Sequence, residues 1–377
     1  MKTAGIICEY NPFHNGHEYQ LQLAKRDYDA VVCIMSGSFV QRGEAAVFDK
    51  WTRTEAALLS GADLVLELPV RFCLSSAQGF ASGAVEILNS SGVVDALVFG
   101  SECADIGMLT YAADIMLSEP PEVSDKIKHL LGRGMGFAAA REAAYSGIIG
   151  DNLLSEPNNV LALEYIMALN RLNSSITPVT HFRTVGYHSV SESGSYASAT
   201  LIRERMKNGV DTGSYLPYNY SGKETYDINR LTDIFRYRLI TEGSGLFTDI
   251  PDAEKGLENR FTRSVNLSSI DEITGFVCNK RHTRARIRRI ILSALLNLRG
   301  GYRNPEYIRV LGMSETGKIL LAEMRKKSSL PVVNKTADFD SPMLREDITA
   351  TNLAALCASE KVPMNRDFLK SPIIKNK

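Results

Sequence analysis

The sequence predicts an α/β fold built around a doubly wound parallel sheet. Short apolar runs of strand length occur at residues 3–8, 30–35, 63–68 and 95–100. Helical patterns separate these runs at the spacing of parallel strand–helix–strand units. A polar turn follows the first run, and a second polar loop follows at residues 39–44. Because open α/β sheets bind ligands at the carboxyl ends of their strands, we expect the site at these turns.

The composition is that of an ordinary globular chain. The 377 residues are 44% hydrophobic and 23% charged, and the formal net charge is zero. Any attraction to nucleic acid must therefore come from local clustering of charge. The six cysteines contain no C-x-x-C pair, and the histidines outside the first turn lack metal-ligand spacing, so we expect reduced thiols and no metal site. With no signal peptide and no apolar run near about 20 residues, we expect a cytoplasmic protein without membrane or protein partners.

The first turn contains the tetrad His14-Asn15-Gly16-His17. Pro12 holds the preceding residue out of the helical region and so ends the first strand. Gly16 leaves room for a ligand to approach the backbone where a helix begins. The unpaired N–H groups of that helix form an anion site, and the two imidazoles can donate hydrogen bonds to a phosphate. The alternative is a helix-capping turn whose histidines are merely solvated.

A second phosphate-binding candidate follows the last predicted strand, at residues 177–183. Ser198 is a reasonable N-cap for a new helix, and Thr200 and Arg203 lie in its first turns. Taken alone, this pattern favours an ordinary capped helix. Together with His14 and His17, it favours a site for the outer phosphates of a nucleotide.

The C-terminal half differs in pattern from the N-terminal half. Residues 216–222 are typical of a linker, so we expect a catalytic domain over residues 1–210 and a mostly helical domain over residues 211–377. Two short strands near residues 307–312 and 330–333 flank a helix and predict a small α/β unit at the end of the second domain. We expect residues 371–377 to be frayed.

A basic segment at residues 274–304 carries many arginines and no acidic residue. Its apolar side chains fall at helical spacing and predict one core-facing stripe: Ile287, Ile290, Ile291, Ala294, Leu295 and Leu298. A second set lies on or near a different face and predicts an RNA-binding surface: Lys280, Arg281, Arg284 and Arg288. The alternative is a solvated face whose acidic partners come from elsewhere in the fold. A membrane surface is less favoured because the apolar stripe lacks aromatic residues.

Several stretches together resemble one known family. The tetrad at His14 resembles the His-x-Gly-His signature of the nucleotidyltransferase superfamily related to class I aminoacyl-tRNA synthetases. The chain as a whole is similar to the bacterial tRNA(Met) cytidine acetate ligases, over at least residues 1–205. The segments that carry this resemblance are residues 9–17, 35–37, 41–44, 50–53, 63–69, 99–102, 157–159 and 198–200.

The resemblance implies a Rossmann-like fold and an ATP-dependent ligase. In that family, ATP activates acetate as acetyl-adenylate, and the acetyl group passes to the exocyclic amine of the wobble cytidine of elongator tRNA(Met). The implied catalytic residues are His14, His17, Thr200 and Arg203. The implied ATP-binding residues are Ile7, Cys8, Glu9, Tyr10, Asn11, Pro12, Phe13, His14, Asn15, Gly16, His17, Glu18, Tyr19, Gln20, Gly100, Asn158 and Arg183.

Two further expectations concern the small ligands. Lys50 and Arg53 open a helix near the strand ends, so they are candidates for a pocket that binds acetate. Mg²⁺ is expected with ATP because it neutralises the triphosphate, although no protein cage for it is visible.

Two alternatives to the ligase remain open from the sequence. One is a nucleotidylyltransferase that transfers AMP to a small phosphorylated metabolite, which would have no use for the basic helix. The other is a non-catalytic ATP-binding or RNA-binding module, which would have no need to retain His14, His17, Thr200 and Arg203.

Overall fold

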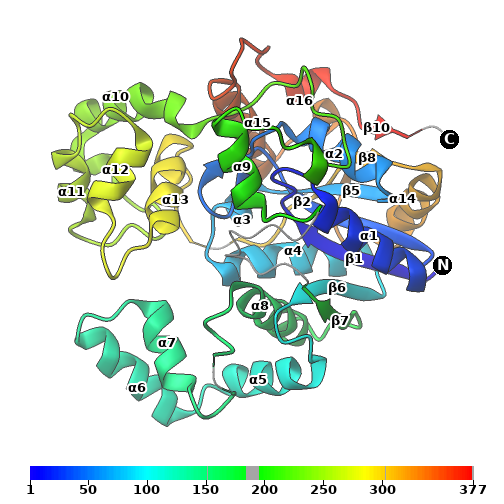
Figure 1. The fold of residues 1–377 in the computed structure, drawn as a ribbon, viewed down its shortest axis with the longest axis horizontal. Helices are drawn as coiled ribbons and strands as arrows, with labels where there is room; N and C mark the ends of the chain where they lie inside the picture. The colour runs from blue at the N-terminus through cyan, green and yellow to red at the C-terminus, as the bar shows by residue number, and fades with distance from the viewer. Residues whose placement is uncertain (151, 184–194, 302, 376–377) are drawn as a thin grey trace.

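In a computed structural model, a single sheet runs through the centre of the molecule (Figure 1). The structure describes residues 1–150, 152–183, 195–301 and 303–375. The strand order is β10-β8-β5-β2-β1-β6-β7, with β9 paired to β8. The strands are β1 (Thr3–Cys8), β2 (Ala30–Ser36), β5 (Leu64–Leu68), β6 (Ala96–Ser101), β7 (Thr177–Phe182), β8 (Ile308–Met313), β9 (Val332–Val333) and β10 (Ile373–Ile374).

Five strands form the parallel, doubly wound centre that the sequence predicts. From β1 the chain builds outward through β2 and β5 on one side, then returns to place β6 and β7 on the other. The carboxyl end of β1 therefore lies at the topological switch point, where open sheets of this kind bind ligands. The expectation of an α/β fold is confirmed.

The sheet is covered by helices on both faces. Along β2 every residue is buried, with alternate side chains entering the two cores, which explains its continuous apolar sequence. One face packs against α1 (Asn15–Asp27) and α2 (Lys50–Leu59). The other face packs against α4 (Ala77–Ser91), α5 (Ile106–Ser118), α8 (Pro157–Arg171), α14 (Glu315–Lys327) and α15 (Pro342–Ala355).

The strands of the predicted C-terminal unit belong to this same sheet. β8 pairs antiparallel with β5, so the sheet is mixed rather than wholly parallel. β10 pairs with β8, and the backbone N–H of Lys375 donates to the Met313 carbonyl at 2.9 Å. The expectation of a frayed tail is therefore wrong as far as Lys375. Backbone pairing of Ile373 and Ile374 with Gly312 and Met313, at the free edge of β8, explains the difference.

Two groups of helices project from the sheet (Figure 1). One consists of α6 (Pro121–Gly132) and α7 (Phe137–Tyr145), which follow α5. The other comprises residues 228–298 and is called the helical lobe below. Its core is shared with the rest of the fold, through residues such as Phe39, Val70 and Ala350. Its helices are α10 (Thr232–Glu242), α11 (Leu257–Arg263), α12 (Ile270–Val277) and α13 (Arg284–Leu295). The predicted apolar stripe faces this core, as expected. Five of its members belong to the cluster, and the sixth, Leu295, is partly buried against it.

The remaining elements are short, apart from α9. They comprise β3 (Phe39–Val40), β4 (Glu44–Ala45), α3 (Val70–Cys73), α9 (Ala199–Lys207), α16 (Arg366–Leu369) and the 3₁₀ helices Gly213–Tyr215, Ile228–Leu231, Gly243–Phe247 and Thr336–Asp338. β3 and β4 form a small hairpin at residues 39–45, beside the carboxyl end of β2. Across the parts of the chain that the structure describes, every helix is too short or too polar to cross a bilayer.

Candidate active site

A cleft of about 240 Å³ opens at the carboxyl ends of β1, β6 and β7, beside the first turns of α1 and α9. It is the place that the sheet topology favours for a ligand. The structure gathers most of the predicted site residues around it: Ile7, Cys8, Glu9, Tyr10, Asn11, His14, Gly16, His17, Tyr19, Gln20, Gly100, Asn158, Arg183, Thr200 and Arg203. Pro12, Phe13, Asn15 and Glu18 share the same turn and helix but are not among the described lining residues.

The two histidines of the tetrad lie together at the start of α1. His14 is the N-cap, and its Nδ1 accepts from the Gly16 N–H at 3.1 Å. The backbone N–H of His14 donates to His17 Nδ1 at 3.3 Å, and the two rings stack with centroids 3.7 Å apart. His14 therefore does cap α1, as the alternative interpretation of this turn holds. Capping accounts for only one nitrogen of the His14 ring, however.

The second ring nitrogen of His14 is available for a ligand. Since Nδ1 accepts a hydrogen bond, the neutral ring carries its proton on Nε2. That Nε2 is buried and has no hydrogen-bond partner among the described residues. A buried donor without a partner is costly, so its place in the lining of a cleft points to an acceptor supplied by a ligand.

Burial keeps both imidazoles neutral. It lowers the pKa of His14 to about 3, with Arg183 and Arg203 adding to the shift. The pKa of His17 is also well below its usual value, through burial, His14 and Arg183, against an opposing backbone hydrogen bond with Pro12. Both rings therefore act as neutral hydrogen-bond donors or acceptors at neutral pH, and the positive charge of the site comes from arginines.

Arg183, just beyond β7, is oriented by a chain of polar contacts. Its Nη1 donates to Asn158 Oδ1 at 2.7 Å, and Asn158 Nδ2 donates to Glu102 Oε1 at 2.5 Å. The Asn159 N–H donates to the second oxygen of Glu102 at 2.8 Å. Asn158 thus connects a carboxylate at the end of β6 to a cation that faces the cleft. Gly100 lies beside them, where an added Cβ would come within 3.2 Å of His181 Nε2.

Arg203 approaches the cleft from α9. Ser198 caps this helix by accepting from the Leu201 N–H at 3.2 Å, as predicted, and Thr200 lines the cleft from the first turn. The Arg203 Nη1 donates to the Asn11 carbonyl at 2.8 Å, and its Nη2 lies 3.4 Å from Glu44 Oε2. Two cations, two imidazoles and two helix N-termini therefore converge on one cleft, which is an arrangement suited to a polyphosphate.

Some lining residues have no role predicted from the sequence. Gln41 and Arg42 lie in the polar loop after β3, which the sequence places near a ligand without indicating a task for either residue. The Gln41 N–H donates to Glu9 Oε1 at 2.6 Å, and burial raises the pKa of Glu9. Phe80 and Tyr165 line the apolar part from α4 and α8. Their sequence context is that of ordinary core residues, so no local signal identifies them.

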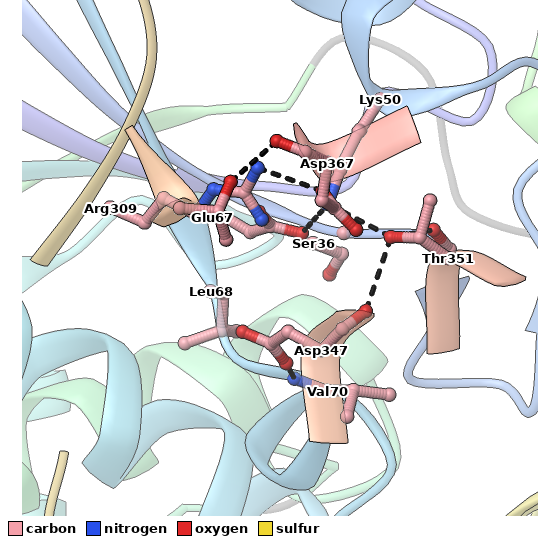
Figure 2. A network of polar contacts seen from close by, with 12 residues as sticks. Ser36, Lys50, Glu67, Leu68, Val70, Arg309, Asp347, Thr351 and Asp367 are labelled. Carbon is pink, nitrogen blue, oxygen red and sulfur yellow. Dashed lines mark hydrogen bonds and ion pairs between the residues drawn. The ribbon is translucent and has the colours of Figure 1, made fainter. Parts of the chain in front are cut away.

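The candidates for the acetate pocket lie elsewhere. Lys50 is fully buried, and Figure 2 shows it enclosed by protein partners. Its Nζ lies 2.7 Å from Glu67 Oε1, 2.7 Å from Asp367 Oδ1 and 3.0 Å from Thr351 Oγ1, which occupies all three donors of the ammonium. Arg53 is fully buried as well, and donates to four carbonyls, those of Glu9, Ser36, Gly37 and Phe48. Neither residue presents a cation to the cleft.

The candidates for RNA binding divide into two kinds. Lys280, Arg281 and Arg284 are exposed at the start of α13 and in the loop before it. Arg288 is held by two carboxylates, with Nη1 2.6 Å from Glu44 Oε1 and Nη2 2.5 Å from Asp271 Oδ1. The alternative of acidic partners from elsewhere in the fold therefore applies to Arg288. Among the described residues, no group of three or more His, Cys, Asp or Glu could hold a metal ion.

The fold and the cleft define a nucleotide-binding protein of the nucleotidyltransferase class, whose signature is the tetrad at His14. A family model described as HIGH Nucleotidyl Transferase matches residues 1–367. A tRNA(Met) cytidine acetate ligase of Caldanaerobacter subterraneus is 39% identical over 100% of both chains. One from Clostridium perfringens is 38% identical over 99% of this chain and 100% of its own.

Solved structures agree with these relatives. Thermotoga maritima TmcAL bound with alpha-thio ATP superposes with a TM-score of 0.89 at 32% identity, over 99% of both chains. Its apo form superposes with a TM-score of 0.91 at 33% identity, over 99% of both chains. The chain belongs to the tRNA(Met) cytidine acetate ligase family of HIGH nucleotidyltransferases.

Proposed function

We propose that this chain is an ATP-dependent acetate ligase that acetylates the exocyclic amine of the wobble cytidine of elongator tRNA(Met). The observation that carries the proposal is the convergence of His14, His17, Arg183 and Arg203 on one cleft at the switch point of the sheet. The names of the full-length relatives add the substrate class. They favour the ligase over a nucleotidylyltransferase that acts on a small metabolite.

In the first step, a carboxylate oxygen of acetate attacks the α-phosphorus of ATP. A mixed anhydride, acetyl-adenylate, forms as the bond to pyrophosphate breaks. This step requires alignment and compensation of charge more than proton transfer. Arg183 and Arg203 supply the positive charge, and the N-terminus of α1 with the Nε2–H of His14 supplies hydrogen bonds to phosphate oxygens.

In the second step, the cytidine amine attacks the acetyl carbonyl, AMP leaves, and the amine loses a proton. The base must leave its stack to reach the cleft, as anticodon bases can do at low cost. We propose that Lys280, Arg281 and Arg284 contact the tRNA backbone, because all three are exposed and lie on or next to one end of α13. Arg288 is not included, because its guanidinium already binds Glu44 and Asp271.

Acetate and Mg²⁺ complete the proposed set of ligands. We propose that acetate binds beside the α-phosphate within the same cleft, since Lys50 and Arg53 have other partners. Mg²⁺ would enter with the triphosphate and be held mainly by its oxygens, as is usual for this ion. We place the reaction in the cytoplasm, where ATP and tRNA are available.

The first test of this function is ATP–pyrophosphate exchange. The assay is run with and without tRNA(Met). The proposal predicts exchange that depends on acetate. Exchange without tRNA would establish a free acyl-adenylate, and exchange only with tRNA would indicate that RNA completes the site. Intact ATP binding without acetate-dependent exchange in either condition would contradict the ligase proposal.

A paired variant tests the RNA surface. The double substitution R281A/R284A should weaken tRNA binding and reduce the slope of log Kd against log salt by about 1.4–1.8, since each phosphate contact contributes roughly 0.7–0.9. A matched control, K318A/K326A, removes two exposed lysines from α14 and should bind tRNA normally. Equal weakening by both pairs would mean that the effect is one of overall charge.

A further inference from the structure

The loop of residues 41–44 lies between the cleft and the helical lobe. On the cleft side, the Gln41 N–H donates to Glu9. On the other side, Arg289 Nη1 donates to the Gln41 carbonyl at 3.3 Å. Gly43 has a φ of +70°, and an added Cβ would lie 2.6 Å from the Arg289 backbone nitrogen. The loop is therefore seated directly on the backbone of α13, with no space for a side chain between them.

Glu44, at the end of this loop, joins two arginines from different parts of the fold. Its Oε2 lies 3.4 Å from Arg203 Nη2, and its Oε1 lies 2.6 Å from Arg288 Nη1. Arg288 in turn binds Asp271 of α12, whose Oδ2 accepts from Asn229 Nδ2 at 2.9 Å. A continuous line of ion pairs thus runs from a cation of the ATP cleft, through the loop, into the helical lobe.

The side chains that form these ion pairs are largely buried. The side chains of Arg203, Glu44 and Arg288 are 19%, 24% and 17% exposed. Ion pairs at such sites are screened less by water and salt than exposed pairs are. A lone carboxylate beside a triphosphate would repel it. Arg288 offsets the charge of Glu44, and so leaves Arg203 directed at the ligand rather than drawn wholly to Glu44.

We propose that Glu44 and Arg288 are positioning residues for adenylate formation, which hold Arg203 in the orientation that the phosphates require. The helical lobe is therefore part of the catalytic site through Arg288, in addition to any role in binding RNA. This inference rests on the proposed function, and it assigns to Arg288 a task that does not involve tRNA.

The test is acetate-dependent exchange without tRNA, since this assay cannot register a lost RNA contact. R288A and E44Q should each lower kcat at least about tenfold and raise the ATP Kd by only about two- to threefold, because the loss falls mainly on the transition state. The double variant E44Q/R288A should be no slower than the slower single variant, as expected for one coupled unit. R288K should recover part of the loss, because one ion pair can re-form.

The control is R286A, on the same helix. Arg286 pairs with Glu254 and the Asp252 carbonyl, away from the cleft, and its loss should leave exchange within about twofold of wild type. Wild-type exchange in R288A, or multiplicative losses in the double variant, would overturn the proposal. Should R288A fail to fold by circular dichroism, wild-type exchange in both E44Q and R288K would overturn it equally.

Failure of the ligase proposal can be told apart from failure of this inference. A wild-type protein that shows no acetate-dependent exchange, either with or without tRNA(Met), contradicts the ligase. Calorimetric titration with ATP then still tests the positioning, because R288A and E44Q should bind ATP more weakly than R286A does. Equal ATP affinity in all three variants would refute it.

Discussion

Replacing Lys50 by Met should destabilise the fold by about 3–5 kcal/mol, the usual cost of removing one partner from a buried ion pair. Lys50 and Arg309 face Glu67 and Asp367 in a neutral group of four charges, each at most 4% exposed (Figure 2). Without Lys50 the group carries one uncompensated negative charge. Because a domain is stable by only about 5–15 kcal/mol, the change should be large in urea unfolding.

A second substitution tests the reasoning about charge. K50M/D367N restores neutrality and should recover part of the lost free energy of unfolding. K318M, which removes an exposed pair with Glu315, should cost less than about 1 kcal/mol. A loss below about 1 kcal/mol for K50M, or a double variant less stable than K50M, would refute this explanation. The same series separates structure from substrate binding, since loss of an acetate ligand would raise the KM for acetate without unfolding the protein.

Three further outcomes are expected. His17→Ala should lower acetate-dependent exchange by about 100-fold or more while filter binding of tRNA stays nearly normal; loss of both activities in a folded variant would contradict two separate sites. Asn158→Ala releases Arg183 from its orienting contact and should raise the KM for ATP by about tenfold in the exchange assay; an unchanged KM would exclude this role. Burial, with Glu67 nearby, raises the pKa of Asp347 from 3.8 to about 8, so the folded protein keeps a proton that the unfolded chain releases. Unfolding free energy should therefore fall as pH rises from about 4 to about 8, and Asp347→Asn should flatten that dependence; an equally steep profile in the variant would assign it to other groups.

The parallel centre of the sheet could be predicted because its signal is local. β1, β2 and β5 are buried on both faces, and their sequences are largely apolar, with Glu67 as the charged exception in β5. The addition of β8 and β10 could not be predicted in the same way. Their pairing joins residues 64–67 to residues 309–313, and residues 312–313 to residues 373–374. The local sequence of a short strand does not indicate which sheet edge it will pair with. Register across such a distance is decided by packing.

Some residues of the candidate site could likewise be predicted from the sequence, and others could not. The tetrad and the α9 turn could be placed because strand ends at a switch point gather in one region, whatever the details of packing. Lys50 could not be placed, because a lysine that opens a helix near strand ends has the same local sequence whether it faces solvent, substrate or a buried carboxylate. For Arg288, the partners Glu44 and Asp271 come from distant segments, so only the folded chain distinguishes an ion pair from an RNA contact.

The proposed ligase activity is tested most directly by transfer of labelled acetate to tRNA. Purified protein, ATP, Mg²⁺, radiolabelled acetate and an elongator tRNA(Met) transcript are incubated, and label in the tRNA is counted after nuclease digestion. We expect label on the wobble cytidine, and none when that base is uridine or when ATP is omitted. Equal labelling of the uridine transcript, or label only in a small phosphorylated product, would contradict the proposed function.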